Sequence, residues 1–327
     1  MENITLDAIL AAKSSIAPFI IETPTVKNGS AEISRLAGPG TDIFLKLELL
    51  QHAGSFKPRG ALSVMMNIEQ HRLKAGVTAV SAGNHAIAVG YAAKILGTTA
   101  KVVMMKNANP FRIRKCQALG AEVILEDNVH AAFERVKHIE ETEGRTFVHP
   151  FEGYYTALGT ATVGYELCQQ APNLDAVIVP IGGGGLCGGV AAAVKLMQPK
   201  CRVYGVEPTG ADSMHRSRAS GKPESIEKVQ TIADSLGAPH AAPFSFSLCQ
   251  KYVDELVLVD DARLIETMKL LFREAKLAVE PAGAAALAAL LGPLHKALQG
   301  KRVGLIVCGA NIDESTWFKL CTPPQDA

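Results

Sequence analysis

Short apolar runs and longer amphipathic segments follow one another along most of the chain. Runs rich in Val, Ile and Leu predict strands at residues 43–50, 77–81, 101–105, 121–125, 146–148, 177–179, 203–206, 256–259 and 303–307. Helical spacing of apolar residues, or alanine-rich composition, predicts helices at residues 5–17, 61–71, 85–96, 109–119, 129–143, 159–170, 187–197, 212–221, 262–276 and 283–291. Strand followed by helix, repeated in this way, is typical of an α/β fold with mostly parallel sheets flanked by helices.

One stretch without charged residues, 177–194, is long enough to cross a membrane. Pro180 and six glycines within it argue against a spanning helix, so we interpret it as a strand, a glycine loop and the start of a helix. Residues 1–10 also lack the basic and apolar regions of a signal peptide. We therefore expect no membrane partner.

Composition excludes several classes of partner and of metal site. The chain has 327 residues and a formal net charge of +1, which indicates neither nucleic acid nor an anionic membrane surface as a partner. Seven cysteines without a CxxC pair indicate reduced thiols in the cytoplasm, and nine scattered histidines offer no zinc-binding spacing. The length suits one large domain or two lobes, and the lack of a low-complexity linker favours two lobes in one body.

A short loop carries one lysine directly after the strand predicted at 43–50. Gly54 and Gly60 allow turns on both flanks, while Phe56 and Pro58 restrict the backbone around Lys57. A lysine that is desolvated at a strand-to-helix junction can form a Schiff base with a carbonyl compound. Taken alone, the loop favours an ordinary surface lysine, and only the other motifs of the chain change that interpretation.

A glycine run, Gly182-Gly183-Gly184-Gly185-Leu186, lies between a predicted strand and a predicted helix. Successive N–H groups at a helix N-terminus stabilise a phosphate, although a tight turn beneath a packed helix has the same pattern. No Gly-Lys-Ser/Thr follows, so the run is not a Walker A motif. Cys187 stands where a dinucleotide fingerprint would need its last glycine.

Three further turns carry polar or ionisable side chains. Ser81-Ala82-Gly83-Asn84-His85 follows a strand at the sheet edge where open α/β folds bind ligands, although Asn84 could simply cap a helix. Glu280 precedes a helix, where a first-turn glutamate is favoured in any case. Cys308 ends the last strand, a place where a thiol is usually a packed core residue.

Together these motifs resemble the fold-type II (tryptophan synthase β-like) pyridoxal 5′-phosphate (PLP) enzymes. Within that group they are most similar to the serine/threonine dehydratase (ammonia-lyase) and serine racemase family. The resemblance spans nearly the whole chain and includes residues 46–61, 81–85, 182–186 and 308. It implies a large PLP-binding domain formed by residues 1–51 and 150–327, with a small inserted domain at 52–149.

The resemblance also implies the roles of individual residues. Lys57 would carry the cofactor and take the substrate Cα proton. The other implied cofactor-binding residues are Phe56, Asn84, Gly182, Gly183, Gly184, Gly185, Leu186, Glu280 and Cys308. Ser81, Ala82, Asn84 and His85 would bind the substrate, chiefly through its carboxylate. The Cys308 thiol, a weak partner for the ring nitrogen, would leave that nitrogen largely unprotonated and favour elimination.

Several positions depart from the family pattern. Ala82 stands where similar racemases have a serine that exchanges a proton, which opposes racemisation. Ile87, Gly159-Thr160-Ala161-Thr162 and Ser235 also differ, which leaves the side-chain pocket open. Glu207 and Ala211 align with a Mg²⁺ or Ca²⁺ site of some members, but Ser213 replaces a carboxylate ligand there and weakens that prediction.

We therefore predict a cytoplasmic homodimer that converts L-threonine or L-serine to a 2-oxo acid and ammonia. Alternatives within the resemblance are a serine racemase, a dehydratase of another 3-hydroxy amino acid such as 3-hydroxyaspartate, or a β-replacement synthase. From other classes, a nucleotide-binding dehydrogenase is opposed by the failed dinucleotide fingerprint. A non-catalytic amino-acid sensor is opposed by the intact lysine loop.

Overall fold

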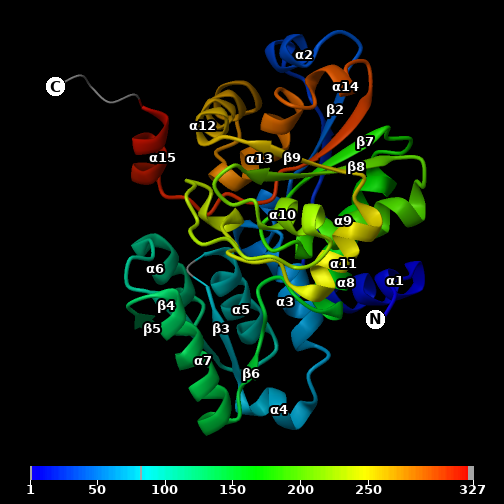
Figure 1. Cartoon of the computed structure of the whole chain (residues 1–327). Helices are drawn as coiled ribbons and strands as arrows, with labels where there is room; N and C mark the ends of the chain where they lie inside the picture. The colour runs from blue at the N-terminus through cyan, green and yellow to red at the C-terminus, as the bar shows by residue number, and fades with distance from the viewer. Residues whose placement is uncertain (1, 82, 323–327) are drawn as a thin grey trace, which may run out of the picture.

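The computed structural model describes residues 2–81 and 83–322 and contains two sheets flanked by helices (Figure 1). The larger sheet has six strands in the order β1-β2-β10-β7-β8-β9, and the smaller has four in the order β5-β4-β3-β6. Every pairing is parallel except that between β1 and β2. The α/β architecture with parallel sheets is therefore confirmed.

The strands of the larger sheet are β1 Thr25–Lys27, β2 Asp42–Lys46, β10 Arg302–Ile306, β7 Ala176–Pro180, β8 Arg202–Pro208 and β9 Glu255–Val259. Those of the smaller sheet are β5 Glu122–Glu126, β4 Ala100–Met105, β3 Val77–Val80 and β6 Thr146–Phe147. All four strands of the smaller sheet fall within residues 52–149. This position supports the predicted inserted domain, whose limits stay a prediction.

The helices are α1 Leu6–Ile16, α2 Ala31–Ala37, α3 Lys57–Met65, α4 Gln70–Ala75, α5 Asn84–Ile95, α6 Pro110–Ala118, α7 Val129–Glu143, α8 Tyr154–Gln170, α9 Gly185–Met197, α10 Ser213–Ser220, α11 Pro243–Tyr252, α12 Asp261–Leu270, α13 Pro281–Leu290, α14 His295–Leu298 and α15 Glu314–Cys321. Short 3₁₀ turns occur at Ala17–Phe19, Glu48–Leu50, His52–Gly54 and Asp234–Leu236, and a π turn at Leu271–Ala275. Among these described residues, no helix has both the length and the apolar character needed to cross a bilayer.

The core of the larger sheet is apolar on both faces because helices cover both. Every residue of β7 is buried, and so is every residue of the alanine-rich α13 that contacts it. A parallel strand enclosed in this way has a continuous apolar sequence without alternation, as residues 176–180 do. Helices α8 and α9 pack closely because Gly164 and Gly189 let their backbones approach.

Three predicted elements have different limits in the structure. The strand predicted at 43–50 ends at Lys46, because the following residues form a 3₁₀ turn with the Glu48 side chain buried. The helix predicted at 61–71 is two helices, α3 and α4, and α3 already begins at Lys57 with Pro58 tolerated in its first turn. Helix α8 begins five residues earlier than predicted.

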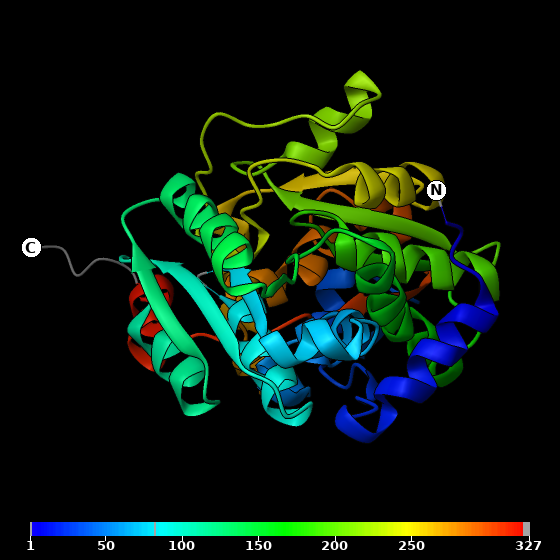
Figure 2. The same ribbon diagram turned by 90° about the horizontal axis from the view of Figure 1, so that it is seen from below.

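Segments far apart in the sequence meet where the two sheets face each other. Helix α15, near the C-terminus, lies beside α6 of the smaller sheet in both views (Figures 1 and 2). The contact is specific, because the Asn109 amide at the start of α6 donates to the Asp313 carboxylate at 2.6 Å. The region between the sheets thus receives residues that are about 200 positions apart in the sequence.

Candidate active site

The loop before Lys57 pairs with the loop that follows the last strand, β10. Ser55 and Gly309 form an isolated antiparallel bridge, and the Phe56 N–H donates to the Cys308 carbonyl at 3.1 Å. The bridge holds the start of α3 against the carboxyl end of the larger sheet, the edge at which α/β proteins bind ligands. Lys57 and Cys308, 251 positions apart in the sequence, therefore belong to one site.

The amine of Lys57 lies in a largely dehydrated setting. Its Nζ donates to the Pro150 carbonyl at 2.5 Å and lies 5.2 Å from the centroid of the Phe56 ring. Desolvation lowers its pKa to about 8, and the neighbouring Cys308 and Glu280 only partly oppose this shift. At pH 7 roughly a tenth of this amine is then uncharged, far more than for an ordinary lysine, and the uncharged form is the one that accepts a proton or acts as a nucleophile.

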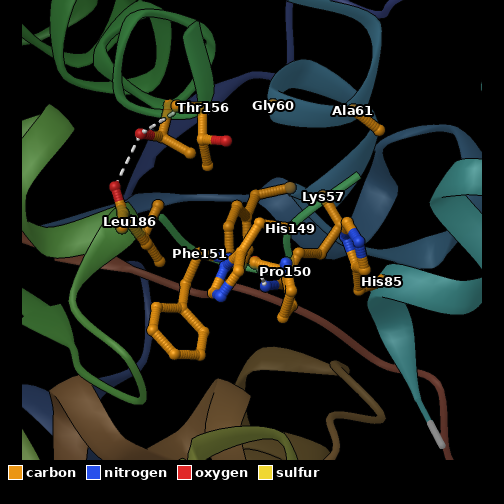
Figure 3. A pocket seen from close by; sticks show the side chains of 12 residues that line it. Lys57, Gly60, Ala61, His85, His149, Pro150, Phe151, Thr156 and Leu186 are labelled. Carbon is orange, nitrogen blue, oxygen red and sulfur yellow. Dashed lines mark hydrogen bonds between the residues drawn. The ribbon is translucent and has the colours of Figure 1, made fainter. Parts of the chain in front are cut away.

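A pocket opens beside Lys57, and Figure 3 shows the side chains that line it. Lys57 and His85 lie together on one side of the pocket and Leu186 lies on the other. Between them the wall is formed by the segment His149–Phe151, which directly follows the smaller sheet. The pocket is therefore built from both sheets.

Two histidines in this wall are neutral, and they use different ring nitrogens, in different roles, to bond the backbone. Because a carbonyl can only accept, His85 carries its proton on Nε2, which lies 2.8 Å from the Val148 oxygen. His149 instead accepts on Nδ1 from the backbone N–H groups of Phe151 and Glu152, at 3.3 and 3.0 Å. Desolvation lowers the pKa of His85 to about 3 and that of His149 to about 4.

These tautomers change what each histidine can do. The only N–H of His85 is engaged with Val148, so in this arrangement His85 offers a lone pair to the pocket and not the donor that a carboxylate needs. Among the residues that the structure describes, nothing accepts from the Nε2–H of His149. The sequence analysis assigned no role to His149, and its position between a strand and Pro150 was the only available signal.

The glycine loop is ready to accept an anion. Within the described chain, the N–H groups of Gly182, Gly183 and Gly184 have no acceptor, and the 13-residue helix α9 begins at the next residue. The loop also needs glycine for close packing. A Cβ at Gly183 would lie 2.2 Å from the Phe151 ring, and one at Gly185 would lie 2.3 Å from the Phe151 carbonyl oxygen. Both earlier interpretations, anion binding and tight packing, therefore apply to the same loop.

Asn84 is the first residue of α5 and not its N-cap, so the capping interpretation is wrong. Its side chain is buried, with Nδ2 donating to Glu280 Oε1 at 2.7 Å and Oδ1 accepting from Asn311 Nδ2 at 2.6 Å. Ser81 Oγ accepts from the Gly83 N–H at 3.1 Å, which closes the turn before α5. Ala82 lies outside the described residues.

Glu280 and Cys308 are buried beside this turn. Desolvation raises the pKa of Glu280, although the Arg112 guanidinium 3.9 Å away opposes the shift. Burial, followed by the charge of Glu280, raises the pKa of the Cys308 thiol, which is therefore neutral. All seven cysteines, each within the described residues, are free thiols.

The positions that depart from the family pattern lie in different surroundings. Ile87 is fully buried in the core of the smaller sheet and does not line the pocket. Gly159 contacts the backbone of Arg59, whereas Thr160 lines the pocket and donates to the Gly185 carbonyl at 2.8 Å. Ser235 Oγ lies 3.4 Å from Asn84 Nδ2. Of these departures, Thr160 and Ser235 are the two placed to affect a ligand.

The residues aligned with a cation site have protein partners. Both carboxylate oxygens of Glu207 accept backbone N–H groups, from Met214 at 2.9 Å and His215 at 2.8 Å, and burial raises its pKa to about 8. Ala211 is buried nearby. Within the described residues, no three His, Cys, Asp or Glu side chains group as metal ligands. The cation site at Glu207 and Ala211 stays a prediction.

Comparisons with known proteins agree with this geometry. A family model described as "Pyridoxal-phosphate dependent enzyme" matches residues 16–309. Phenylserine dehydratase of Ralstonia pickettii is 52% identical over 96% of this chain and 95% of its own length. L-threonine ammonia-lyase of Thermotoga maritima is 38% identical over 95% and 76%. The solved structure of serine racemase from maize has a TM-score of 0.90 and 35% identity, covering 96% of this chain and 97% of its own.

The described residues fit a PLP molecule. The free N–H groups of the glycine loop and the N-terminus of α9 suit its phosphate, and the partly uncharged Lys57 amine suits its aldehyde. Asn84 and the neutral Cys308 thiol lie at the junction beside Lys57, where the ring would be held. The donor set thus matches each polar part of the cofactor.

Proposed function

Since the chain belongs to the family of pyridoxal-phosphate-dependent enzymes, we propose that it converts a 3-hydroxy amino acid with an uncharged side chain, such as L-threonine or L-serine, to a 2-oxo acid and ammonia. The reaction breaks the Cα–H and C3–O bonds, releases water, and then releases ammonia by hydrolysis. PLP supplies the electron sink for this chemistry when bound. Lys57 is placed to take the Cα proton, because desolvation keeps part of its amine uncharged.

The proposal that the substrate has an uncharged side chain rests on the electrostatics of the pocket wall. Apart from Lys57, the described lining residues include no lysine or arginine, and burial keeps both His85 and His149 neutral. A second carboxylate, as in 3-hydroxyaspartate, would be buried here without a compensating cation, which is unfavourable. This argument opposes the 3-hydroxyaspartate alternative.

A second candidate substrate is 3-phenylserine. Four rings form a row with centroids 5.6 Å apart for Phe147 and His149, 4.6 Å for His149 and Phe151, and 5.8 Å for Phe151 and His240, and the two central rings, His149 and Phe151, line the pocket. A substrate phenyl group would find edge and face contacts along such a row. The 52% identity to a phenylserine dehydratase supports the same substrate.

The test is 2-oxo acid release from a panel of L-threonine, L-serine, L-threo-3-phenylserine and L-threo-3-hydroxyaspartate. We expect turnover of at least one of the first three and little of the last. The enantiomer composition of the remaining substrate is measured in the same samples. Racemisation without 2-oxo acid would replace dehydration by the racemase alternative, and efficient use of 3-hydroxyaspartate would contradict the uncharged pocket.

We also propose that the enzyme is a cytoplasmic homodimer with the two-domain division stated above. Seven free thiols support a reducing compartment, and the dimer rests on family resemblance alone. Light scattering after size-exclusion chromatography measures the oligomeric state directly. A monomeric mass at working concentration would contradict it.

A further inference from the structure

A row of hydrogen bonds runs from the smaller sheet to the base of the site. Lys115 Nζ, on α6, donates to Asn311 Oδ1 at 2.7 Å. Asn311 Nδ2 donates to Asn84 Oδ1 at 2.6 Å and to the Ala53 carbonyl at 2.7 Å. Asn84 Nδ2 in turn donates to Glu280 Oε1 at 2.7 Å. The row links α6, the loop after β10, the lysine loop and α5.

The partners of Asn311 determine the direction of every bond in this row. A lysine ammonium can only donate, and the Ala53 carbonyl can only accept. Asn311 must therefore turn its oxygen to Lys115, which leaves its NH₂ for Asn84. Asn84 must then turn its oxygen to Asn311 and its own NH₂ toward Glu280.

The row passes directly beneath the lysine loop. A Cβ built on Gly309 would lie 3.0 Å from Glu280 Oε1 and 3.2 Å from Asn84 Nδ2, and one on Gly54 would lie 2.7 Å from Asn311 Oδ1. Asn84, Asn311 and Glu280 are all buried. An asparagine in this position has little room to exchange its partners for water, so its amide orientation depends on the row.

We propose that Lys115 and Asn311 are positioning residues, which hold the Asn84 amide so that it presents N–H, and not oxygen, to the anionic ring oxygen of PLP. One N–H of Asn84 Nδ2 donates to Glu280 Oε1 at 2.7 Å, and the other has only a long, 3.4 Å contact with Ser235 Oγ, which the ring oxygen of the cofactor would replace. This inference rests on the proposed role of Asn84 as a cofactor-binding residue. It does not depend on the identity of the substrate.

The backbone of Asn311 is anchored independently of Lys115. Its N–H donates to Glu280 Oε2 at 3.0 Å, and its carbonyl accepts from Arg112 Nε at 3.0 Å. Removing the Lys115 amine should therefore leave the Ala53 carbonyl as the remaining group that fixes which way the Asn311 amide points, and so loosen that amide without displacing the loop. This separation makes Lys115 a better probe than a residue that holds the backbone.

The test compares PLP-loaded variants by the absorption spectrum of the bound cofactor and by PLP affinity. Lys115→Met should shift the absorption spectrum and weaken PLP binding about tenfold, as expected on losing a hydrogen bond to a charged group. Lys115→Arg, which keeps a cation that can only donate, should restore both. Lys106→Met removes an exposed lysine from the same lobe and should change neither.

Two further variants test the same row: one replaces the donor that faces Asn84 by an acceptor, and one removes the Asn84 amide itself. Asn311→Asp places an acceptor against Asn84 Oδ1 and should perturb the spectrum at least as strongly as Lys115→Met. Asn84→Ala defines the full effect of losing the amide. If Asn84→Ala changes the absorption spectrum and PLP affinity and Lys115→Met changes neither, the proposed positioning role of Lys115 is wrong. If neither does, the cofactor role of Asn84 fails, and the inference fails with it.

Discussion

Lys57 and Arg59 stand two residues apart at the start of α3 and are both buried, yet their pKa values shift in opposite directions. The Arg59 guanidinium is fully buried between Glu48 and Glu166, with N–O distances of 2.8 Å to each. Lys46 joins the same cluster through a 2.7 Å contact with Glu166. Lys57 points the other way, toward the pocket, and its hydrogen-bond partner is a backbone carbonyl.

The difference lies in the partners. Burial opposes the charge of both cations, but Glu48 and Glu166 outweigh it at Arg59 and raise the pKa of that guanidinium above its ordinary value. No carboxylate contacts the Lys57 amine in the described structure, and its pKa falls to about 8. Paired burial thus makes a permanently charged structural cluster, whereas unpaired burial makes a reactive amine.

The largest expected effect is loss of activity at the unpaired cation. Lys57→Ala should lower turnover by at least about 10³-fold, because it removes both the attachment point of the cofactor and the base. The free energy of unfolding of the cofactor-free protein should not fall, because an unpaired amine is removed from a dry setting. Steady-state kinetics and urea unfolding measure the two quantities. Retained turnover would contradict the assignment.

The paired cation should show the opposite pattern, with stability lost first. Arg59→Met leaves Glu48 and Glu166 buried with Lys46 as their one remaining cation, and should lower the free energy of unfolding by about 3–5 kcal/mol. Arg35→Met removes an exposed ion pair with Glu32 and should have no measurable effect. Equal stability of the two variants in urea would show that the buried cluster is not structural.

A smaller effect is expected at the glycine loop that faces Lys57. Gly185→Ala would place a Cβ 2.3 Å from the Phe151 carbonyl oxygen, so the backbone must shift, at a cost of about 1–3 kcal/mol. We expect weaker PLP binding together with lower thermal stability. Gly29→Ala is the matched control, because nothing lies within 4 Å of its Cβ position. Unchanged PLP affinity in Gly185→Ala would contradict the proposal that the glycine loop binds PLP.

An effect that vanishes at neutral pH concerns the neutral histidine beside Lys57. His85 has a folded pKa of about 3 against an ordinary 6.5, so below pH 6.5 the unfolded chain binds more protons. Stability should therefore fall by about 1.4 kcal/mol per pH unit from this group as pH decreases from 6.5 toward 3. His85→Asn should remove that slope, whereas His71→Asn, at an exposed site, should keep it. Unfolding measured at pH 7 and pH 5 checks the difference.

Prediction from sequence succeeded where a local pattern has one structural solution. Buried strands such as β7 and the glycine loop before α9 were correctly placed, because a short apolar run and consecutive glycines constrain the backbone by themselves. The strand predicted at 43–50 was too long, because the end of β2 depends on Lys46 and Glu48 entering a buried ion cluster with Glu166. That cluster joins residues more than 100 positions apart.

The sequence alone determined the fold class, the family and the positions of Lys57 and the glycine loop, because these depend on local periodicity and on motifs that are contiguous in the chain. Only the tertiary structure decided the tautomers of His85 and His149, the pairing of Arg59, and the orientation of the Asn84 amide. Each of these properties depends on the partner that a side chain meets after folding. A partner such as Asn311, 227 positions from Asn84, leaves no trace in the local pattern, since hydrogen bonds and desolvation act through space.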